Sequence, residues 1–198
     1  MKKLVYGQVT QEQLRERFNI TLETTNWTAL PALAEIPNWL QVVLEEFQKY
    51  PSTTTEKYLS ESVIAPILLA VRNLNGVGLY SGVTLTTDEF TGICDFVIAR
   101  QPRPVVMTSA IIAVVEAKKQ DIEAGVAQCI AEMLAARTYN LKYKLTQKKV
   151  FGCVTTASEW QFLQLEEDNR ILFLGRRYFL TELSQILGIF KWMINEFK

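Results

Sequence analysis

The sequence predicts one α/β domain in which a mixed central sheet is flanked by helices. Its length of 198 residues suits a single well-packed domain. Apolar residues recur at helical spacing over residues 56–74, and the spacing then changes to alternation in three consecutive segments. A second helical segment and another strand-like segment follow. The predicted order is therefore helix, three strands, helix, strand, with additional elements at both ends.

Residues 1–50 are expected to form an N-terminal helical arm ahead of a core that spans residues 51–198. Thr10 and Gln13 have the spacing of a capping box, which predicts the start of a helix. Pro37 is expected to open a second helix, because proline is favoured in the first helical turn. The apolar face predicted for this second helix consists of Trp39, Val42, Val43 and Phe47.

The first helix of the core should span residues 56–74, with capping-box spacing between Thr53 and Glu56. Pro66 lies inside this segment and is expected to kink the helix, because proline lacks the amide hydrogen that the helix needs. The third of the strands that follow is apolar on both faces, which predicts a central strand covered on both sides. The three strands are predicted at residues 78–87, 90–100 and 108–119.

The second half of the core is predicted to begin with a helix over residues 122–144, for which Asp121 is the expected N-cap. A fourth strand follows over residues 148–158. The next segment has the pattern of a hairpin that turns at Asp168 and Asn169.

The chain ends in a strongly apolar helix, predicted over residues 180–197. Its apolar stripe is wider than a surface helix needs, so we expect the stripe to be buried in the core. An interface in a homodimer is the alternative. The stripe consists of Leu183, Ile186, Leu187, Ile189, Phe190, Met193, Ile194 and Phe197.

Composition narrows the possible functions. The chain contains no histidine, which excludes Ser-His-Asp and Cys-His nucleophiles and zinc sites that need imidazole. The three cysteines, Cys94, Cys129 and Cys153, lie far apart in apolar surroundings and indicate reduced core residues of an intracellular protein. The formal net charge is zero, so no global positive field attracts nucleic acid. No signal peptide or apolar run near ~20 residues is present, so we expect a cytoplasmic protein with no membrane partner.

Asp95 is the first candidate functional residue. The other three of the four aspartates have turn or cap explanations, whereas Asp95 lies inside the predicted strand GICDFVI. Aspartate is disfavoured in strands, and a buried carboxylate without a partner is unfavourable. The alternative is a carboxylate on a solvent face, but its expected same-face neighbours, Ile93 and Val97, are apolar.

Glu116 and Lys118 are the next candidates, because they end the most hydrophobic strand and point to the same side of it. The E-x-K tripeptide alone is weak evidence, since a second copy occurs at residues 196–198. Adjacent strands lie ~4.8 Å apart, so Asp95 and Glu116 can approach closely. Two carboxylates at ~4 Å repel by roughly 4 kcal/mol at a dielectric near 20. Lys118 would neutralise one charge and a divalent cation the other, and oxygen ligands suit Mg²⁺ or Mn²⁺.

An Asp on one strand, an E-x-K that ends the next strand and a following helix resemble the PD-(D/E)XK nucleases, which have a restriction-endonuclease-like fold. The interval from Asp95 to Glu116 is ordinary for this superfamily. Glu61 on the preceding helix and Gln128 on the following helix match two accessory positions. The resemblance covers roughly residues 56–160 and is greatest to the N-terminal nuclease-like module of type I restriction-enzyme motor subunits.

The resemblance implies a role for each of these residues. Lys118 would orient or help to deprotonate the attacking water, and Glu61 would bind metal through water or a second ion. Gln128 would position Lys118 or contact the phosphate backbone. The metal would be held by Asp95, Glu116 and the carbonyl of Ala117.

The sequence therefore predicts a Mg²⁺-dependent nuclease that acts on nucleic acid, DNA rather than RNA. The alternative is a catalytically inactive nuclease-fold module that binds nucleic acid or a partner protein, and a third possibility is a purely structural subunit. Glu61 could instead only begin a kinked helix, and Gln128 could be a solvated helical residue. One departure from the family pattern is Cys94, which stands where the motif has proline.

Overall fold

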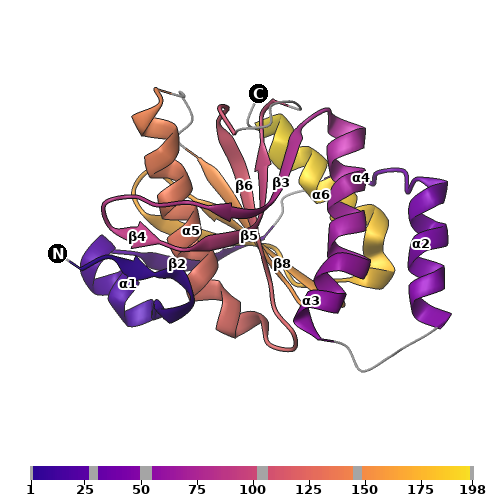
Figure 1. Ribbon diagram of the computed structural model, residues 1–198, viewed down its shortest axis with the longest axis horizontal. Helices are drawn as coiled ribbons and strands as arrows, with labels where there is room; N and C mark the ends of the chain where they lie inside the picture. The colour runs from indigo at the N-terminus through magenta and orange to yellow at the C-terminus, as the bar shows by residue number, and fades with distance from the viewer. Residues whose placement is uncertain (1, 27–30, 50–54, 102–106, 145–148, 197–198) are drawn as a thin grey trace.

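A mixed sheet forms the centre of the protein (Figure 1). The computed structural model describes residues 2–26, 31–49, 55–101, 107–144 and 149–196. Strands β6–β7 and β2–β9 pair in parallel, and the other neighbours in the sheet are antiparallel. The short β10 (Tyr178–Phe179) also pairs with β8. The strand order is β2 (Thr21–Thr25), β9 (Arg170–Leu174), β8 (Glu159–Leu165), β7 (Val150–Thr155), β6 (Ile111–Ala117), β5 (Ile93–Ala99) and β3 (Gly78–Thr84).

Helices cover both faces of this sheet (Figure 1). On one face, α5 (Ile122–Lys142) and α1 (Gln11–Phe18) enclose one apolar cluster. On the other, α4 (Ala65–Asn75), α6 (Leu183–Glu196) and α2 (Asn38–Lys49) enclose a second. The predicted α/β class, with a mixed central sheet flanked by helices, is thus confirmed.

The two central strands of the sheet are fully buried. Every residue of β6 and of β7 is buried, as the doubly apolar pattern of β6 predicted. At the far end of β6, the buried Asn140 of α5 accepts a hydrogen bond from the Ile111 amide and donates one to the Ile111 carbonyl, both at 2.8 Å. This pair satisfies the first backbone groups of β6 and fixes α5 across the sheet.

The N-terminal arm differs from the prediction because it contributes strands as well as helices. The capping box of Thr10 and Gln13 is present at the start of α1. The 3-10 turn η1 (Tyr6–Gln8) follows β1 (Leu4–Val5), which pairs in parallel with β4 (Phe90–Thr91). The threonine-rich β2 then extends the main sheet by pairing with β9. An all-helical arm was therefore wrong, because β-branched residues at a free sheet edge favour strand pairing.

The second helix of the arm starts directly after Pro37, as predicted, but it buries a different face. Leu40 and Leu44 are the buried residues of α2. The expected face was wrong for Trp39, Val42 and Val43, which are 38%, 49% and 37% exposed, while Phe47 is half-buried. Helix α2 lies at the outer edge of the molecule, so only a narrow stripe of it meets the core (Figure 1).

The helix predicted over residues 56–74 forms with an irregular segment ahead of Pro66. It consists of α3 (Glu56–Leu59), the π-helical η2 (Ser60–Ile64) and α4. The wider π turn fits the kink expected from the missing amide hydrogen of proline. The N-cap is Thr55, whose hydroxyl accepts a hydrogen bond from the Tyr58 amide at 3.1 Å, and the expected cap Thr53 lies outside the described residues.

The C-terminal segments follow the prediction. Asp121 caps α5, and the hairpin of β8 and β9 turns at Asp168 and Asn169, where Asn169 has a left-handed φ of 67°. A 3-10 turn, η3 (Leu180–Glu182), leads into α6.

The wide apolar face of α6 is buried within the chain. The predicted stripe from Leu183 to Ile194 lies in the core, and Phe197 is outside the described residues. Residues 31–34 of the arm cross this helix, since the Ala34 amide donates to the Ser184 carbonyl at 3.0 Å. None of the described helices is both long enough and apolar enough to span a bilayer.

Candidate active site

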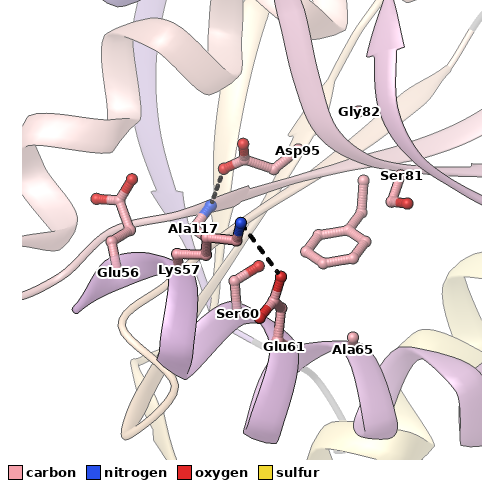
Figure 2. A pocket seen from close by; sticks show the side chains of 10 residues that line it. Glu56, Lys57, Ser60, Glu61, Ala65, Ser81, Gly82, Asp95 and Ala117 are labelled. Atoms are coloured by element: carbon pink, nitrogen blue, oxygen red, sulfur yellow. Dashed lines mark hydrogen bonds and ion pairs between the residues drawn. The ribbon is translucent and has the colours of Figure 1, made fainter. Parts of the chain in front are cut away.

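A pocket of about 380 Å³ lies between one end of the sheet and the helical segment that runs from α3 to α4 (Figure 2). The helical wall is polar and carries Glu56, Lys57, Ser60 and Glu61, with Ala65 behind them. The sheet contributes Ser81, Gly82, Asp95, Phe96 and Ala117. Three of the predicted site residues, Glu61, Asp95 and Ala117, therefore line one cavity.

Asp95 lies where the pairing of β5 with β6 ends. The ladder pairs Phe96 with Val115, and Asp95 is the next residue outward on β5. Its Oδ2 accepts a hydrogen bond from the Ala117 amide at 2.9 Å, as Figure 2 shows. The carboxylate thus takes the acceptor role that a backbone carbonyl has inside the ladder. On the other side of β5, Gly82 has a φ of 63° and interrupts the pairing opposite Asp95.

The surroundings of Asp95 are less apolar than its sequence neighbours indicated. Asp95 itself is half-buried, and Val97 is fully buried. Ile93, however, is 59% exposed, so the prediction that Asp95 lies on a buried apolar face was wrong on this side of the residue. The reason is that β5 begins at Ile93, at the open end of the sheet.

Glu116, Lys118 and Gln128 form one hydrogen-bonded chain behind the pocket. The Lys118 ammonium donates to Glu116 Oε1 at 2.5 Å and to Gln128 Oε1 at 3.1 Å. The Glu116 side chain is only 2% exposed, and that of Lys118 is 21% exposed. Glu116 is absent from the pocket wall and points instead toward α5, which carries Gln128. Gln128 is therefore a partner of Lys118 and not a solvated helical residue.

Glu132 extends this chain and was missed by the sequence reasoning. It is completely buried on α5, and its Oε1 accepts a hydrogen bond from Gln128 Nε2 at 3.1 Å. Its carboxyl group also interacts with that of Glu116. The signal was present in the sequence, because a Glu four residues after Gln128, within an apolar helix, lies on the same helical face.

The buried carboxyl groups of Glu116 and Glu132 each have an oxygen that only a proton or a cation could stabilise. Oε2 of Glu116 and Oε2 of Glu132 have no hydrogen-bond donor among the described residues. Burial, and then repulsion from Asp95, raise the pKa of Glu116 to about 7, although the hydrogen bond from Lys118 opposes this. Burial, and then repulsion from Glu116, raise the pKa of Glu132 well above its usual range. A proton on Glu132 donated to Glu116 gives both oxygens a partner.

Glu61 stands apart from these groups. It belongs to the π-helical segment on the opposite wall, and its side chain is 67% exposed. Its described partner is Lys57, one helical turn earlier, at 3.9 Å (Figure 2). The fold thus brings Asp95, Glu116, Lys118 and Gln128 into one neighbourhood and leaves Glu61 across the cavity.

The donor chemistry of the site fits a hard divalent cation. Asp95 Oδ1 accepts no hydrogen bond from the described residues, and the Ala117 backbone borders the same pocket. Glu116 supplies a second carboxylate close enough to be repelled by Asp95. Within the described ranges, no three acidic or thiol side chains gather closely enough to form a complete metal cage. Water would have to supply the remaining positions, as it commonly does for Mg²⁺.

The arrangement combines an anionic, solvent-accessible pocket with the half-buried ammonium of Lys118 behind it. Such a pairing can hold a cation at the carboxylates and a polarised water or an anionic oxygen near the ammonium. Comparison with known proteins adds no constraint, since no family model matches the chain and no curated protein matches it significantly.

Proposed function

We propose that this protein is a metal-dependent nuclease with a restriction-endonuclease-like core, which hydrolyses phosphodiester bonds of nucleic acid, DNA rather than RNA. One observation carries the proposal. Asp95 and Glu116 lie on adjacent strands where the ladder opens, and Lys118 bridges Glu116 and Gln128 directly beside them. A lone buried acid could be structural, but two repelling carboxylates with a single ammonium are a charge arrangement that needs a functional reason.

Each residue then has a chemical role. Mg²⁺ or Mn²⁺, when bound, would polarise the phosphoryl oxygen and lower the pKa of a water molecule. Asp95, Glu116 and the Ala117 carbonyl would hold it, and Glu116 would have to turn its carboxyl from α5 toward the pocket to do so. Glu61, across the pocket, would be a ligand through water. Lys118 would orient the attacking water and balance the negative charge that builds on phosphorus. Gln128 fixes the ammonium, and Glu132 fixes Gln128.

The reaction is a displacement at phosphorus. The water oxygen forms a bond to phosphorus while the bond from phosphorus to one ester oxygen breaks. The water proton passes to solvent, and the departing oxygen gains a proton from solvent. The ammonium of Lys118 is a hydrogen-bond donor in this scheme, because its pKa lies above the ordinary value. Burial lowers this pKa, but the hydrogen bond and charge of Glu116, together with the charges of Glu56 and Asp95, raise it by more.

A second candidate function is a nuclease-fold module that binds nucleic acid or a partner protein without cleavage. It is favoured by the ion pair between Lys118 and Glu116, which neutralises one of the two carboxylates without any metal. A protein of this kind would keep the pocket and the buried chain but would have no use for a divalent cation.

Cleavage of DNA decides between the two. Wild type is incubated with supercoiled and with single-stranded DNA in Mg²⁺ and in Mn²⁺, beside Glu116→Ala and Lys118→Ala. The matched control is Asp88→Ala, which removes a carboxylate at an exposed residue outside the site. A nuclease requires cleavage by wild type and the control and none by the two site variants. Absence of cleavage on both substrates with both metals contradicts catalysis.

Metal binding is tested independently by thermal stability. A cation that binds only the folded state stabilises it by ~2.7 kcal/mol at 100 times its dissociation constant. Melting of wild type should therefore shift upward by several degrees as Mg²⁺ is added, whereas Asp95→Asn should not respond. Equal responses of the two proteins would show that the cation does not bind at Asp95.

A further inference from the structure

A second cavity opens on the outer side of the candidate active site. It has a volume of about 470 Å³ and lies between α2, α4 and the edge strand β3. Unlike the first pocket, its outer lining is almost wholly apolar. The residues that belong to this cavity alone are Trp39, Val43, Pro66, Leu69 and Leu79.

The two cavities are adjacent. Four residues line both of them, namely Glu61, Ala65, Ser81 and Phe96. A nucleotide with its phosphate at the Asp95 end of the first pocket therefore has the apolar groove on the other side of these four residues. The groove thus lies next to the pocket in which the proposed reaction takes place.

Trp39 is the largest of the apolar side chains that line the groove. Its side chain is 38% exposed, and the indole makes no ring contact with any described aromatic residue. An indole that faces solvent in a cavity is unusual, because burial of a Trp side chain is strongly favourable. Val43 and Leu69, which border the same cavity, are 37% and 36% exposed. The groove is therefore lined by a partly exposed indole and by partly exposed aliphatic side chains.

The charges around the groove limit what can occupy it. Among the described residues that line the cavity, Glu61 is the only charged one, so the described lining offers no cation to a phosphate or an acidic peptide. The chain as a whole has no net charge, so no global positive field attracts a phosphate backbone to it. A neutral, flat and apolar group fits this lining, and a nucleobase is the part of nucleic acid with that chemistry.

We propose that the groove binds an unpaired nucleobase next to the scissile phosphate, with the base stacked on Trp39. This inference rests on the proposed nuclease function and specifies its substrate class. In a duplex each base is covered by its stacked neighbours, so its face cannot reach the indole. The preferred substrate is accordingly single-stranded nucleic acid, or a duplex with a displaced or flipped base at the cut position.

The test measures binding without cleavage. A fluorescently labelled dT oligonucleotide and an abasic oligonucleotide of the same length are titrated in EDTA, with anisotropy as the readout. The proteins are wild type, Trp39→Ala and Trp39→Phe, and circular dichroism verifies that each is folded. Val42→Ala is the matched control, because Val42 lies on the same helix, is 49% exposed and does not line the groove.

The dT oligonucleotide should bind wild type more tightly than the abasic one. Trp39→Ala should weaken dT binding by between about fivefold and a hundredfold and leave abasic binding unchanged, because stacking on an aromatic side chain supplies an affinity of this size per base. Trp39→Phe should restore most of the loss, and Val42→Ala should behave like wild type. Equal affinity for both oligonucleotides, or no loss in Trp39→Ala, overturns the proposal, as does preferential binding of a duplex.

The outcome remains separable from that of the nuclease proposal. Base-dependent binding through Trp39 in a protein that cleaves no DNA would support the groove and refute catalysis. Cleavage that depends on Asp95 but is indifferent to Trp39, with equal rates on duplex and single-stranded DNA, would support catalysis and refute the groove. A protein that pulls down a partner only when Trp39 is present, and binds no oligonucleotide, would also refute the nucleobase.

Discussion

Replacement of Glu132 by glutamine tests the buried carboxyl chain most directly. The side chain of Glu132 is fully buried, accepts a hydrogen bond from Gln128 and contacts Glu116. A glutamine at this position has nearly the same shape. Its carbonyl can accept from Gln128 and its amide can donate to Glu116, so Glu132→Gln keeps both contacts and removes one ionisable group. Glu132→Leu removes both contacts and is the matched comparison.

The sign of the pH effect follows from the raised pKa values. A carboxyl group with a higher pKa in the folded than in the unfolded chain binds its proton more tightly when folded. Its contribution is favourable at low pH, and stability is lost as pH rises from the ordinary value of 4.5 through the folded value. For Glu116, with a pKa of about 7, the loss across this window is about 3 kcal/mol. The pKa of Glu132 is also raised well above its usual range, so this group adds a loss of the same sign.

Urea unfolding between pH 5 and pH 9 measures both effects. Wild type should lose stability as the pH rises, and Glu132→Gln should show a shallower slope and become the more stable protein at the alkaline end. Glu132→Leu should be destabilised by about 2–5 kcal/mol near pH 7, because it leaves polar groups of Gln128 and Glu116 buried without partners. Identical slopes for wild type and Glu132→Gln, or equal stability of the two variants, would refute the shared-proton account of this pair.

Three further substitutions test the framework by urea unfolding. Asn140→Leu should destabilise by about 2–4 kcal/mol, because the amide and carbonyl of Ile111 lose their only described side-chain partner; a change below 1 kcal/mol would contradict this. Gly188→Ala should destabilise by about 1–3 kcal/mol despite the better helix propensity of alanine, since the new Cβ would lie 2.3 Å from the Ala32 carbonyl oxygen; a gain in stability would show that residues 31–34 do not press on α6. Glu61→Gln should leave stability within about 0.5 kcal/mol, because an exposed ion pair contributes little, and a larger loss would mean that Glu61 has a structural role.

The order of elements was predictable from the sequence wherever one kind of periodicity persisted. The change from helical to alternating spacing near residue 76 identified β3, β5 and β6, and the doubly apolar pattern of β6 identified a central strand. The N-terminal arm was less predictable. The pairing of β2 with β9 joins residues 21–25 to residues 170–174, and no local pattern announces a partner so far along the chain.

The candidate site was also predictable only in part. Strand alternation and the E-x-K spacing were enough to select Asp95, Glu116 and Lys118 as neighbours, because strand geometry is fixed by the backbone. Which way each carboxylate turns was decided only by tertiary structure. Asp95 points to the pocket because the ladder ends beside it, whereas Glu116 points to α5 and meets Glu132 there.

The sequence by itself therefore determined the fold class, the central strands and the candidates Asp95, Glu116, Lys118 and Gln128. Tertiary structure alone decided that Glu132 completes the buried chain, that Glu61 lies across the cavity, and that Trp39 borders a groove beside the pocket. The physical reason is that backbone periodicity is a local property. Burial, repulsion between carboxylates and the shape of a cavity depend on residues that meet only after the chain has folded.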